Sequence, residues 1–215
     1  MYENNTEDIL CSGIEYTFLS LISDKVKVLI VGGGRAALIK AKTFLKKGCN
    51  VSVVAKDFIE EFIELKNKEN ITLIEGEYNS NHIDKNHLII IATNCASLND
   101  EIRKDCDKVY KLYIDCSSPK DGLCITPCQR SSKNISFGIH TKAGSPKTSV
   151  YVANKVEKYL EDFDNFIEFT ACIRNRMKNS SNKKEIMDFI CSDDFYFFCE
   201  RGKEREIFSM FYDLD

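Results

Sequence analysis

The feature that most constrains the fold is a strand, a glycine turn and a helix that follow one another without a linker. Residues 28–48 read VLIVGGGRAALIKAKTFLKKG. Val26 to Val31 is a short, β-branched apolar run, which is typical of a strand buried in a parallel sheet. Gly48 stands where a helix C-cap is expected. Between the glycines and Gly48, five apolar residues recur with helical spacing: Ala37, Leu38, Ala41, Phe44 and Leu45.

The glycine turn itself has the spacing of a dinucleotide-binding loop. Gly32-x-Gly34-x-x-Ala37 fits the G-x-G-x-x-[G/A] pattern, and it has the required strand before it and helix after it. Gly32 permits a tight turn, Gly34 lets the backbone approach a pyrophosphate, and Ala37 is small enough for the helix to pack on the strand. The N–H groups at the start of the helix would attract the phosphates. The alternative is a glycine turn that only connects a strand to a helix.

The end of the second predicted strand, residues 51–55, bears on the choice between NAD and NADP. An acidic side chain there would bind the ribose hydroxyls, and basic side chains would favour the 2′-phosphate of NADP. The chain carries Ala55, Lys56 and Asp57 at this point. Asp57 favours NAD and Lys56 opposes it, while two solvated loop charges would explain both residues equally. We predict NAD.

Strands and helices continue to alternate up to residue 114, which predicts a doubly wound parallel sheet of the Rossmann type. The expected strands are 26–31, 51–55, 71–74, 87–92 and 109–114, and the expected helices include 58–65 and 98–104. All three prolines then fall within residues 119–146, where a further strand is expected at 135–141. The rest of the chain has helical spacing. We therefore predict three regions: a nucleotide-binding domain (1–113), a middle segment (114–150) and a small helical domain (151–215).

Several classes of protein are disfavoured by composition. The net charge of −3 gives no reason to expect nucleic acid as a partner. No apolar run approaches the roughly 20 residues that span a bilayer, and the polar, acidic first residues do not resemble a signal peptide. We expect a cytoplasmic protein that does not bind membranes. Its ten cysteines contain no C-x-x-C pair, so we predict no metal site; the grouping closest to one is Cys116, Cys124 and Cys128.

Four segments in this order resemble one family. They are residues 16–58 (YTFLSLISDKVKVLIVGGGRAALIKAKTFLKKGCNVSVVAKDF), 89–102 (IIIATNCASLNDEI), 112–119 (LYIDCSSP) and 135–160 (ISFGIHTKAGSPKTSVYVANKVEKYL). Together they are similar to the precorrin-2 dehydrogenases, which form the N-terminal module of siroheme synthases. The helical tail, with KKEIMDFI at 183–190, is similar to the small C-terminal domain of that family.

The resemblance implies an enzyme that removes two hydrogens from precorrin-2 to give sirohydrochlorin, with NAD as the acceptor. It implies a homodimer in which the middle segment exchanges contacts across the two-fold axis and the tetrapyrrole cleft lies between the domains. Some members of the family also insert iron or cobalt, so a bifunctional dehydrogenase and ferrochelatase is one alternative. Insertion of added Fe²⁺ or Co²⁺ into sirohydrochlorin would distinguish the bifunctional enzyme from a dehydrogenase alone.

The resemblance also assigns roles to individual residues. Asp115 matches the family's catalytic aspartate, and its place at the C-terminal end of a predicted strand suits a proton acceptor; the alternative is an aspartate that only caps its own loop. Thr141 matches a serine or threonine of the substrate loop. The residues expected to bind the cofactor are Gly32, Gly33, Gly34, Arg35, Ala36, Lys56, Asp57, Thr93 and Asn94.

The middle segment is locally basic although the whole chain is acidic. Between residues 116 and 150 it has five basic residues and one acidic residue, Asp121. Such a patch suits a ligand with many carboxylates, and a solvated surface stretch is the alternative. The basic residues are Lys120, Arg130, Lys133, Lys142 and Lys147. The residues expected to bind substrate are Arg130, His140, Thr141 and Lys142.

The chain departs from the family pattern at several positions. Leu112 stands where the family has asparagine, and Asn94 where it has aspartate. His140, Lys142 and Ala143 stand where serine and two glycines are usual. These bulkier side chains favour a second alternative, a non-catalytic protein that binds a dinucleotide or a tetrapyrrole on the same fold. In the tail, the aromatic residues 195–198, 208, 211 and 212 are expected to form the core and the dimer-packing surface.

Overall fold

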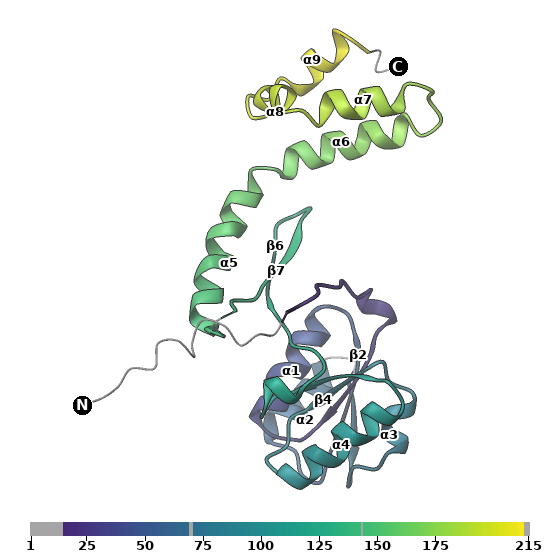
Figure 1. The fold of residues 1–215 in the computed structure, drawn as a ribbon, viewed down its shortest axis with the longest axis vertical. Coiled ribbons are helices and arrows are strands. Elements are labelled where there is room, and N and C mark those ends of the chain that lie inside the picture. Colours follow the sequence, from purple (N-terminus) through teal and green to yellow (C-terminus); the bar gives the residue numbers. More distant parts are fainter. Residues whose placement is uncertain (1–14, 69–70, 143, 213–215) are drawn as a thin grey trace, which may run out of the picture. The chain divides into compact units, whose positions relative to one another are not determined.

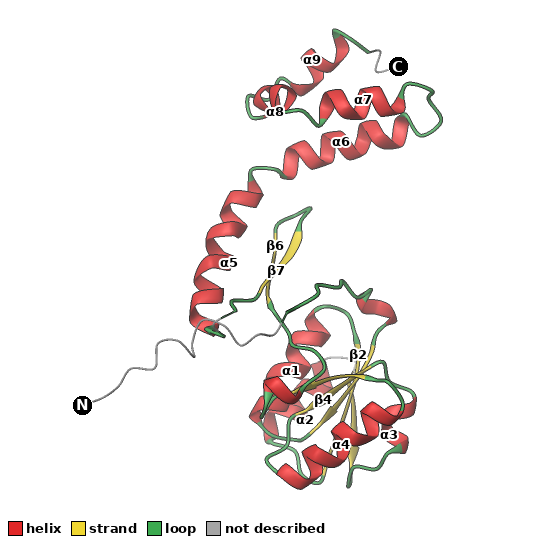
Figure 2. Ribbon diagram, in the orientation of Figure 1, coloured by secondary structure: helices red, strands yellow, loops and turns green. Residues whose placement is uncertain are grey.

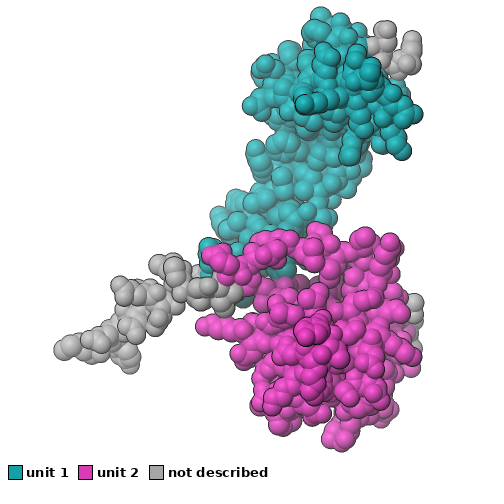
Figure 3. Space-filling model, turned by 45° about the vertical axis from the view of Figure 1, so that its right-hand side comes forward, with its two compact units in different colours: residues 1–14, 127–215 teal, residues 15–126 magenta. Residues whose placement is uncertain are grey.

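The computed structural model describes residues 15–68, 71–142 and 144–212. They divide into two compact units, shown in different colours in Figure 3. Glu15–Thr126 forms the sheet unit, and the chain from Pro127 onward forms the C-terminal unit. The predicted division into three regions at 113/114 and 150/151 stays a prediction. Residues 1–14 of its first region and Ala143 of the expected substrate loop lie outside the described residues.

The sheet unit contains a five-stranded parallel sheet in the order β3-β2-β1-β4-β5. This order confirms the predicted Rossmann-type fold. Strands β2 and β3 are added on one side of β1, and β4 and β5 are added on its other side, so the strand order reverses at β1 and β4. The strands are β1 (Lys27–Val31), β2 (Asn50–Ala55), β3 (Ile71–Glu75), β4 (Leu88–Ile91) and β5 (Leu112–Asp115). The helices are α1 (Arg35–Lys46), α2 (Glu60–Lys68), α3 (Asn81–Asp84) and α4 (Ala96–Lys108).

Both faces of this sheet are covered by helices, as Figures 1 and 2 show. Helices α1 and α2 lie on one face and α3 and α4 on the other. Alternate residues of each strand therefore enter different cores: Ile90 packs with α1 and α2, and Ile89 with α3 and α4. Each of these side chains is fully buried, which stabilises the sheet by about 1.5–3 kcal/mol per side chain. Burial on both faces explains why the central strands β1 and β4 read as nearly continuous apolar runs.

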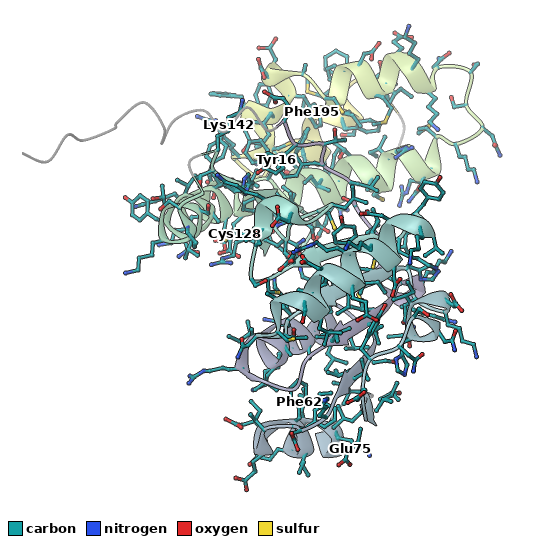
Figure 4. All side chains as sticks on the ribbon, turned by 60° about the horizontal axis from the view of Figure 1, so that its bottom comes forward. Tyr16, Phe62, Glu75, Cys128, Lys142 and Phe195 are labelled. Atoms are coloured by element: carbon teal, nitrogen blue, oxygen red, sulfur yellow. The ribbon has the colours of Figure 1, made fainter. Side chains whose placement is uncertain are left out.

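The C-terminal unit begins with an antiparallel hairpin and continues as five helices within its described part. The hairpin pairs β6 (Cys128–Ser131) with β7 (Ser136–Ile139). The helices are α5 (Pro146–Glu161), α6 (Asp164–Arg176), α7 (Lys183–Ile190), α8 (Asp193–Cys199) and α9 (Glu204–Ser209). Figure 4 labels Phe195, which is buried at the centre of the aromatic core of α6 to α9. The figure also labels Phe62, which lies in the core between the sheet and α2.

Several details differ from the sequence-based expectations. β5 begins at Leu112 rather than 109, because the chain turns after α4 with Tyr110 at a positive φ of 55°. The strand β6 and the short helix α3 were not expected. The aromatic tail, by contrast, agrees with the expectation of both a core and a surface: Phe195 and Phe208 are buried, and Phe197 and Phe211 are exposed. Packing of this surface against a second copy stays a prediction.

Candidate active site

The C-terminal ends of the parallel strands collect the residues predicted to bind the cofactor. The glycine turn follows β1, Lys56 and Asp57 follow β2, and Thr93 and Asn94 follow β4. Asp115 is the last residue of β5. In open α/β sheets, ligands bind at this edge, beside the strands where the order reverses. The sheet unit therefore holds the nine predicted cofactor residues and Asp115 on one edge.

Two of the three glycines are required by the chain itself. Gly32 has a φ of +128°, and a Cβ there would collide with the carbonyl oxygen of Ala92. A Cβ on Gly33 would collide with the carbonyl oxygen of Asp57. The turn is pinned to the neighbouring strand because the Gly32 N–H donates to the Val54 carbonyl at 2.9 Å. Both glycines thus hold the turn close to β2 and β4.

Gly34 is different, because no part of the chain requires it. A Cβ on Gly34 would meet no atom within 4 Å. Gly34 is exposed and immediately precedes α1, whose first residues Arg35 and Ala36 are also exposed. The first N–H groups of a helix have no acceptor within the helix and carry partial positive charge. The space above Gly34 therefore fits the close approach of a phosphate group to the backbone.

The end of β2 carries an exposed ion pair. Lys56 Nζ lies 2.7 Å from Glu77 Oε1, and both side chains are largely exposed. The hydrogen bond and charge of Glu77 raise the pKa of Lys56, so the lysine stays cationic but is partly neutralised by its partner. Asp57 is exposed, and its backbone carbonyl packs against Gly33. The acidic and basic residues that bear on the choice between NAD and NADP therefore both stand beside the glycine turn.

Asp115 is fully buried and fully hydrogen-bonded. Its Oδ1 accepts the N–H groups of Ser117 at 2.8 Å and Ser118 at 2.9 Å, and the Ser117 hydroxyl at 2.6 Å. Its Oδ2 forms an ion pair with Arg103. Burial acts to raise the pKa of Asp115, but these hydrogen bonds and the guanidinium outweigh it and leave the pKa below its ordinary value. Asp115 is therefore a carboxylate shielded from solvent.

A polar network continues from Asp115 to the end of β4. The Asn99 amide donates to Ser117 Oγ at 3.1 Å and to the Thr93 carbonyl at 3.2 Å. Its Oδ1 accepts the Thr93 hydroxyl. Asn99 is itself buried. The residues that follow β4 and β5 are thus tied together through one amide side chain on α4.

This network borders a surface pocket of about 340 Å³. The residues that line it are polar except Ala96: Thr93, Asn94, Ala96, Asn99, Arg103, Ser117, Ser118 and Asp121. Asp115 is not among the lining residues, because Ser117 and Arg103 cover its carboxylate. The predicted catalytic residue therefore faces the pocket only through these two side chains.

Sequence reasoning missed Asn99, Arg103 and Ser117. The spacing of Asn99 and Arg103 was one available signal: they stand four residues apart and therefore occupy the same face of α4. Arg103 bridges Asp115 and Asp100, with Asp121 at 3.9 Å. No pattern on the sequence indicated that this face turns toward the end of β5.

The predicted substrate residues lie in the C-terminal unit. Arg130 on β6 binds two residues of α5. Its Nε donates to Asn154 Oδ1 at 2.9 Å and lies 3.7 Å from Glu157 Oε2. Thr141 Oγ1 accepts the N–H of Ser145 at 3.1 Å, directly before α5.

The other two substrate candidates stand on either side of Thr141. His140 is half-buried, and Lys142, labelled in Figure 4, is exposed. Thr141 and its two neighbours thus form the approach to α5, whereas Arg130 is held on the hairpin by its contacts with that helix.

The described residues also bear on two other kinds of feature, metal sites and membrane-spanning helices. Within residues 15–68, 71–142 and 144–212, no three His, Cys, Asp or Glu side chains are grouped so that they could hold a metal ion. Cys116 and Cys124 are half-buried, and burial raises the pKa of both thiols. Among the helices of these residues, none combines the length and apolar character needed to cross a membrane.

Comparison with known proteins places the chain in a family. Residues 19–128 match the family model described as "Putative NAD(P)-binding". The protein of Methanocaldococcus jannaschii named "Putative precorrin-2 dehydrogenase" is 31% identical over 84% of this chain and 88% of its own length. A siroheme synthase of Baumannia cicadellinicola is 27% identical over 86% of this chain, but the match spans only 42% of that longer protein.

A solved structure shares the fold. The precorrin-2 dehydrogenase SirC superposes with a TM-score of 0.69 at 23% identity, over 92% of this chain and all of SirC. The sheet unit therefore carries an NAD(P)-binding domain of the doubly wound class. The chain belongs to the precorrin-2 dehydrogenase family.

Proposed function

We propose that this chain oxidises precorrin-2 to sirohydrochlorin with NAD as the hydride acceptor, in siroheme or related tetrapyrrole biosynthesis. The observation that carries the proposal is the space above Gly34: the chain leaves it open at the start of α1, on the same edge of the sheet as the pocket at the ends of β4 and β5. The names of the relatives support the choice of substrate. The proposed cellular location is the cytoplasm.

The residues of the glycine turn bind the cofactor in this proposal. The backbone at Gly32, Gly33 and Gly34 and the first turn of α1, with Arg35 and Ala36, hold the pyrophosphate. Lys56, Asp57, Thr93 and Asn94 surround the rest of the molecule. When bound, the oxidised nicotinamide supplies the acceptor for the hydride that leaves the macrocycle.

NAD is proposed over NADP because the local charges at β2 favour it. Glu77 pairs with Lys56 at 2.7 Å and reduces the positive charge available to a 2′-phosphate. Asp57 adds a negative charge two residues beyond β2. NADP should therefore bind more weakly than NAD, and Glu77→Gln should narrow the difference because it releases Lys56. An NADP affinity equal to that of NAD in the unmodified protein would contradict the assignment.

The proposed substrate contacts lie before α5. Arg130, His140, Thr141 and Lys142 are assigned to the carboxylates and ring of the tetrapyrrole, with Asp115 as the group that accepts the proton. Arg130 is held against Asn154 and Glu157, so its guanidinium must share or leave these contacts to bind a substrate carboxylate. Replacement of Arg130 or of Lys142 by Ala should raise the KM for precorrin-2, because each removes a positive charge.

A homodimer is part of the proposal, and the outer surface of α5 supports it. The helix buries Ser149 and Ala153 and leaves four apolar side chains exposed within this unit. These are Val150, Tyr151, Val152 and Tyr159. Val152 and Tyr159 stand seven residues apart on one side of α5, and a second copy that covered this side would remove both from water. Sedimentation at several concentrations should give a dimer.

The direct test is to incubate the protein with precorrin-2 and NAD under anaerobic conditions and follow NADH and sirohydrochlorin together. The expected result is one NADH formed for each sirohydrochlorin. Binding of both ligands without NADH would favour the non-catalytic alternative. Addition of Fe²⁺ or Co²⁺ to sirohydrochlorin then tests the ferrochelatase alternative.

A further inference from the structure

The geometry around Asp115 raises a question about how a proton reaches it. The side chain has no exposed surface. One carboxylate oxygen accepts three hydrogen bonds from the turn that follows, and the other is paired with Arg103. A carboxylate in this position does not touch a substrate in the neighbouring pocket. A group that does line the pocket must stand between them.

Ser117 has the contacts that such a group needs. It is exposed and lines the pocket, and its hydroxyl donates to Asp115 Oδ1 at 2.6 Å. Its oxygen accepts the Asn99 amide at 3.1 Å, which leaves the hydroxyl hydrogen directed at the carboxylate. A hydroxyl oxygen has two acceptor lone pairs. One receives the Asn99 N–H, and the second is the acceptor that a proton from the substrate requires.

We infer that Ser117 is a catalytic residue that relays the proton from the substrate in the pocket to Asp115. This role rests on the proposed dehydrogenase function. As a C–H bond of precorrin-2 breaks, the hydride leaves with both electrons to the oxidised nicotinamide. The accompanying proton passes to Ser117 Oγ, and the Ser117 hydroxyl proton passes to Asp115 Oδ1. The macrocycle thereby loses two hydrogens, one NADH forms, and Asp115 becomes a neutral acid that returns its proton by the same path.

The charges around Asp115 suit a carboxylate that accepts a proton briefly during turnover and is ionised between turnovers. Arg103 from α4 holds Asp115 ionised before the transfer, and Asp100 and Asp121 share that guanidinium. Cys116, which follows Asp115 directly after β5, is half-buried. Because the resting carboxylate is ionised, it is ready to receive a proton through Ser117 as each turnover begins.

The test compares Ser117→Ala and Ser117→Thr, with Ser80→Ala as a matched control. Ser80 is an exposed serine of the same unit that precedes α3 and makes no side-chain cap. Ser117→Ala should lower kcat by about 100-fold, the size typical of a lost acid–base group, while the KM for precorrin-2 and the Kd for NAD change by less than about threefold. Ser117→Thr keeps a hydroxyl and should restore most of kcat, and Ser80→Ala should have no effect.

A proton inventory in mixtures of H₂O and D₂O separates a relay from a structural role. The unmodified protein should give a curved dependence of kcat on deuterium content, because two protons move together. Ser117→Ala should give a straight line, because one proton moves. In an active enzyme, either of two results would overturn the relay alone. One is a Ser117→Ala variant that keeps kcat within twofold, and the other is a Ser117→Thr variant that does not restore kcat. A protein that forms no NADH from precorrin-2 would remove both the proposed function and this role.

Discussion

The two units each place an aspartate beneath a turn, but the turns come from very different distances along the chain. In the sheet unit, Asp115 accepts N–H groups from Ser117 and Ser118, two and three residues ahead. In the C-terminal unit, Asp164 at the start of α6 accepts the N–H groups of Lys133 and Asn134, about thirty residues back in the hairpin turn. The first contact shapes a loop, and the second joins a hairpin to a helix.

The cores of the units differ in the same way. The sheet unit buries aliphatic side chains on parallel strands that are distant in sequence, so its edge is fixed by the whole sheet. The core of α6 to α9 combines isoleucine with aromatic side chains and is built by helices that follow one another directly. From this difference we infer that the whole sheet fixes the positions of the site residues on its edge, whereas the stability of the helical core depends on a few large side chains. The predictions below test that contrast.

The largest expected effect is in the aromatic core. Phe195 stacks on Phe169 with ring centroids 5.7 Å apart and meets Phe189 edge-to-face at 5.3 Å. Phe195→Ala should lower the free energy of unfolding by about 3–5 kcal/mol, because a fully buried aromatic ring leaves a cavity. The matched control is Phe197→Ala on the same helix, which should lower the free energy of unfolding far less because residue 197 is 48% exposed. Denaturant unfolding measures both, and equal losses would contradict the assigned core.

The next effect distinguishes two adjacent glycines. Gly33→Ala should destabilise the sheet unit by about 1–3 kcal/mol, because the new Cβ would overlap the Asp57 carbonyl. Gly34→Ala should leave the unfolding free energy nearly unchanged, because a Cβ there meets nothing within 4 Å. Thermal unfolding of the two variants checks this order. Equal destabilisation would mean that Gly34 is also required by the fold.

The smallest stability effect concerns the two aspartates and pH. Burial acts to raise the pKa of Asp115 and that of Asp164, but hydrogen bonds from the turns outweigh it and lower both. Each carboxylate therefore stabilises the folded protein fully above its unfolded pKa of about 3.9, and this stabilisation is lost as the pH falls through the lower native pKa. At neutral pH, Asp115→Asn and Asp164→Asn should each lower Tm by a few degrees, with the larger loss for the buried Asp115.

Titration of Tm against pH checks the sign of this effect. The difference between the unmodified protein and each variant should be constant from neutral pH down to about pH 5 and should shrink in more acidic solution. A difference that grows as the pH falls would contradict the lowered pKa values.

Comparison of the two units also shows how much the sequence could predict. The parallel sheet was predictable because strands buried on both faces must be apolar throughout, as residues 88–91 are. Asp115 was predictable as a site candidate because it ends such a strand. The strand β6 was not, since Cys128–Ser131 is short and has no buried residue. Contacts that join distant segments, such as Asp164 with the hairpin turn or Arg103 with Asp115, depend on tertiary packing that no local pattern reports.

The measurement that tests the central claim most directly is a calorimetric titration of NAD into the unmodified protein, Gly34→Ala and Gly34→Asp. The account predicts that both variants fold, that Ala weakens binding by about tenfold, equivalent to about 1.4 kcal/mol, and that Asp abolishes it because its carboxylate meets the phosphates. Folded Gly34→Asp protein that binds NAD with unchanged affinity would show that the dinucleotide does not lie on this turn, and would contradict the account.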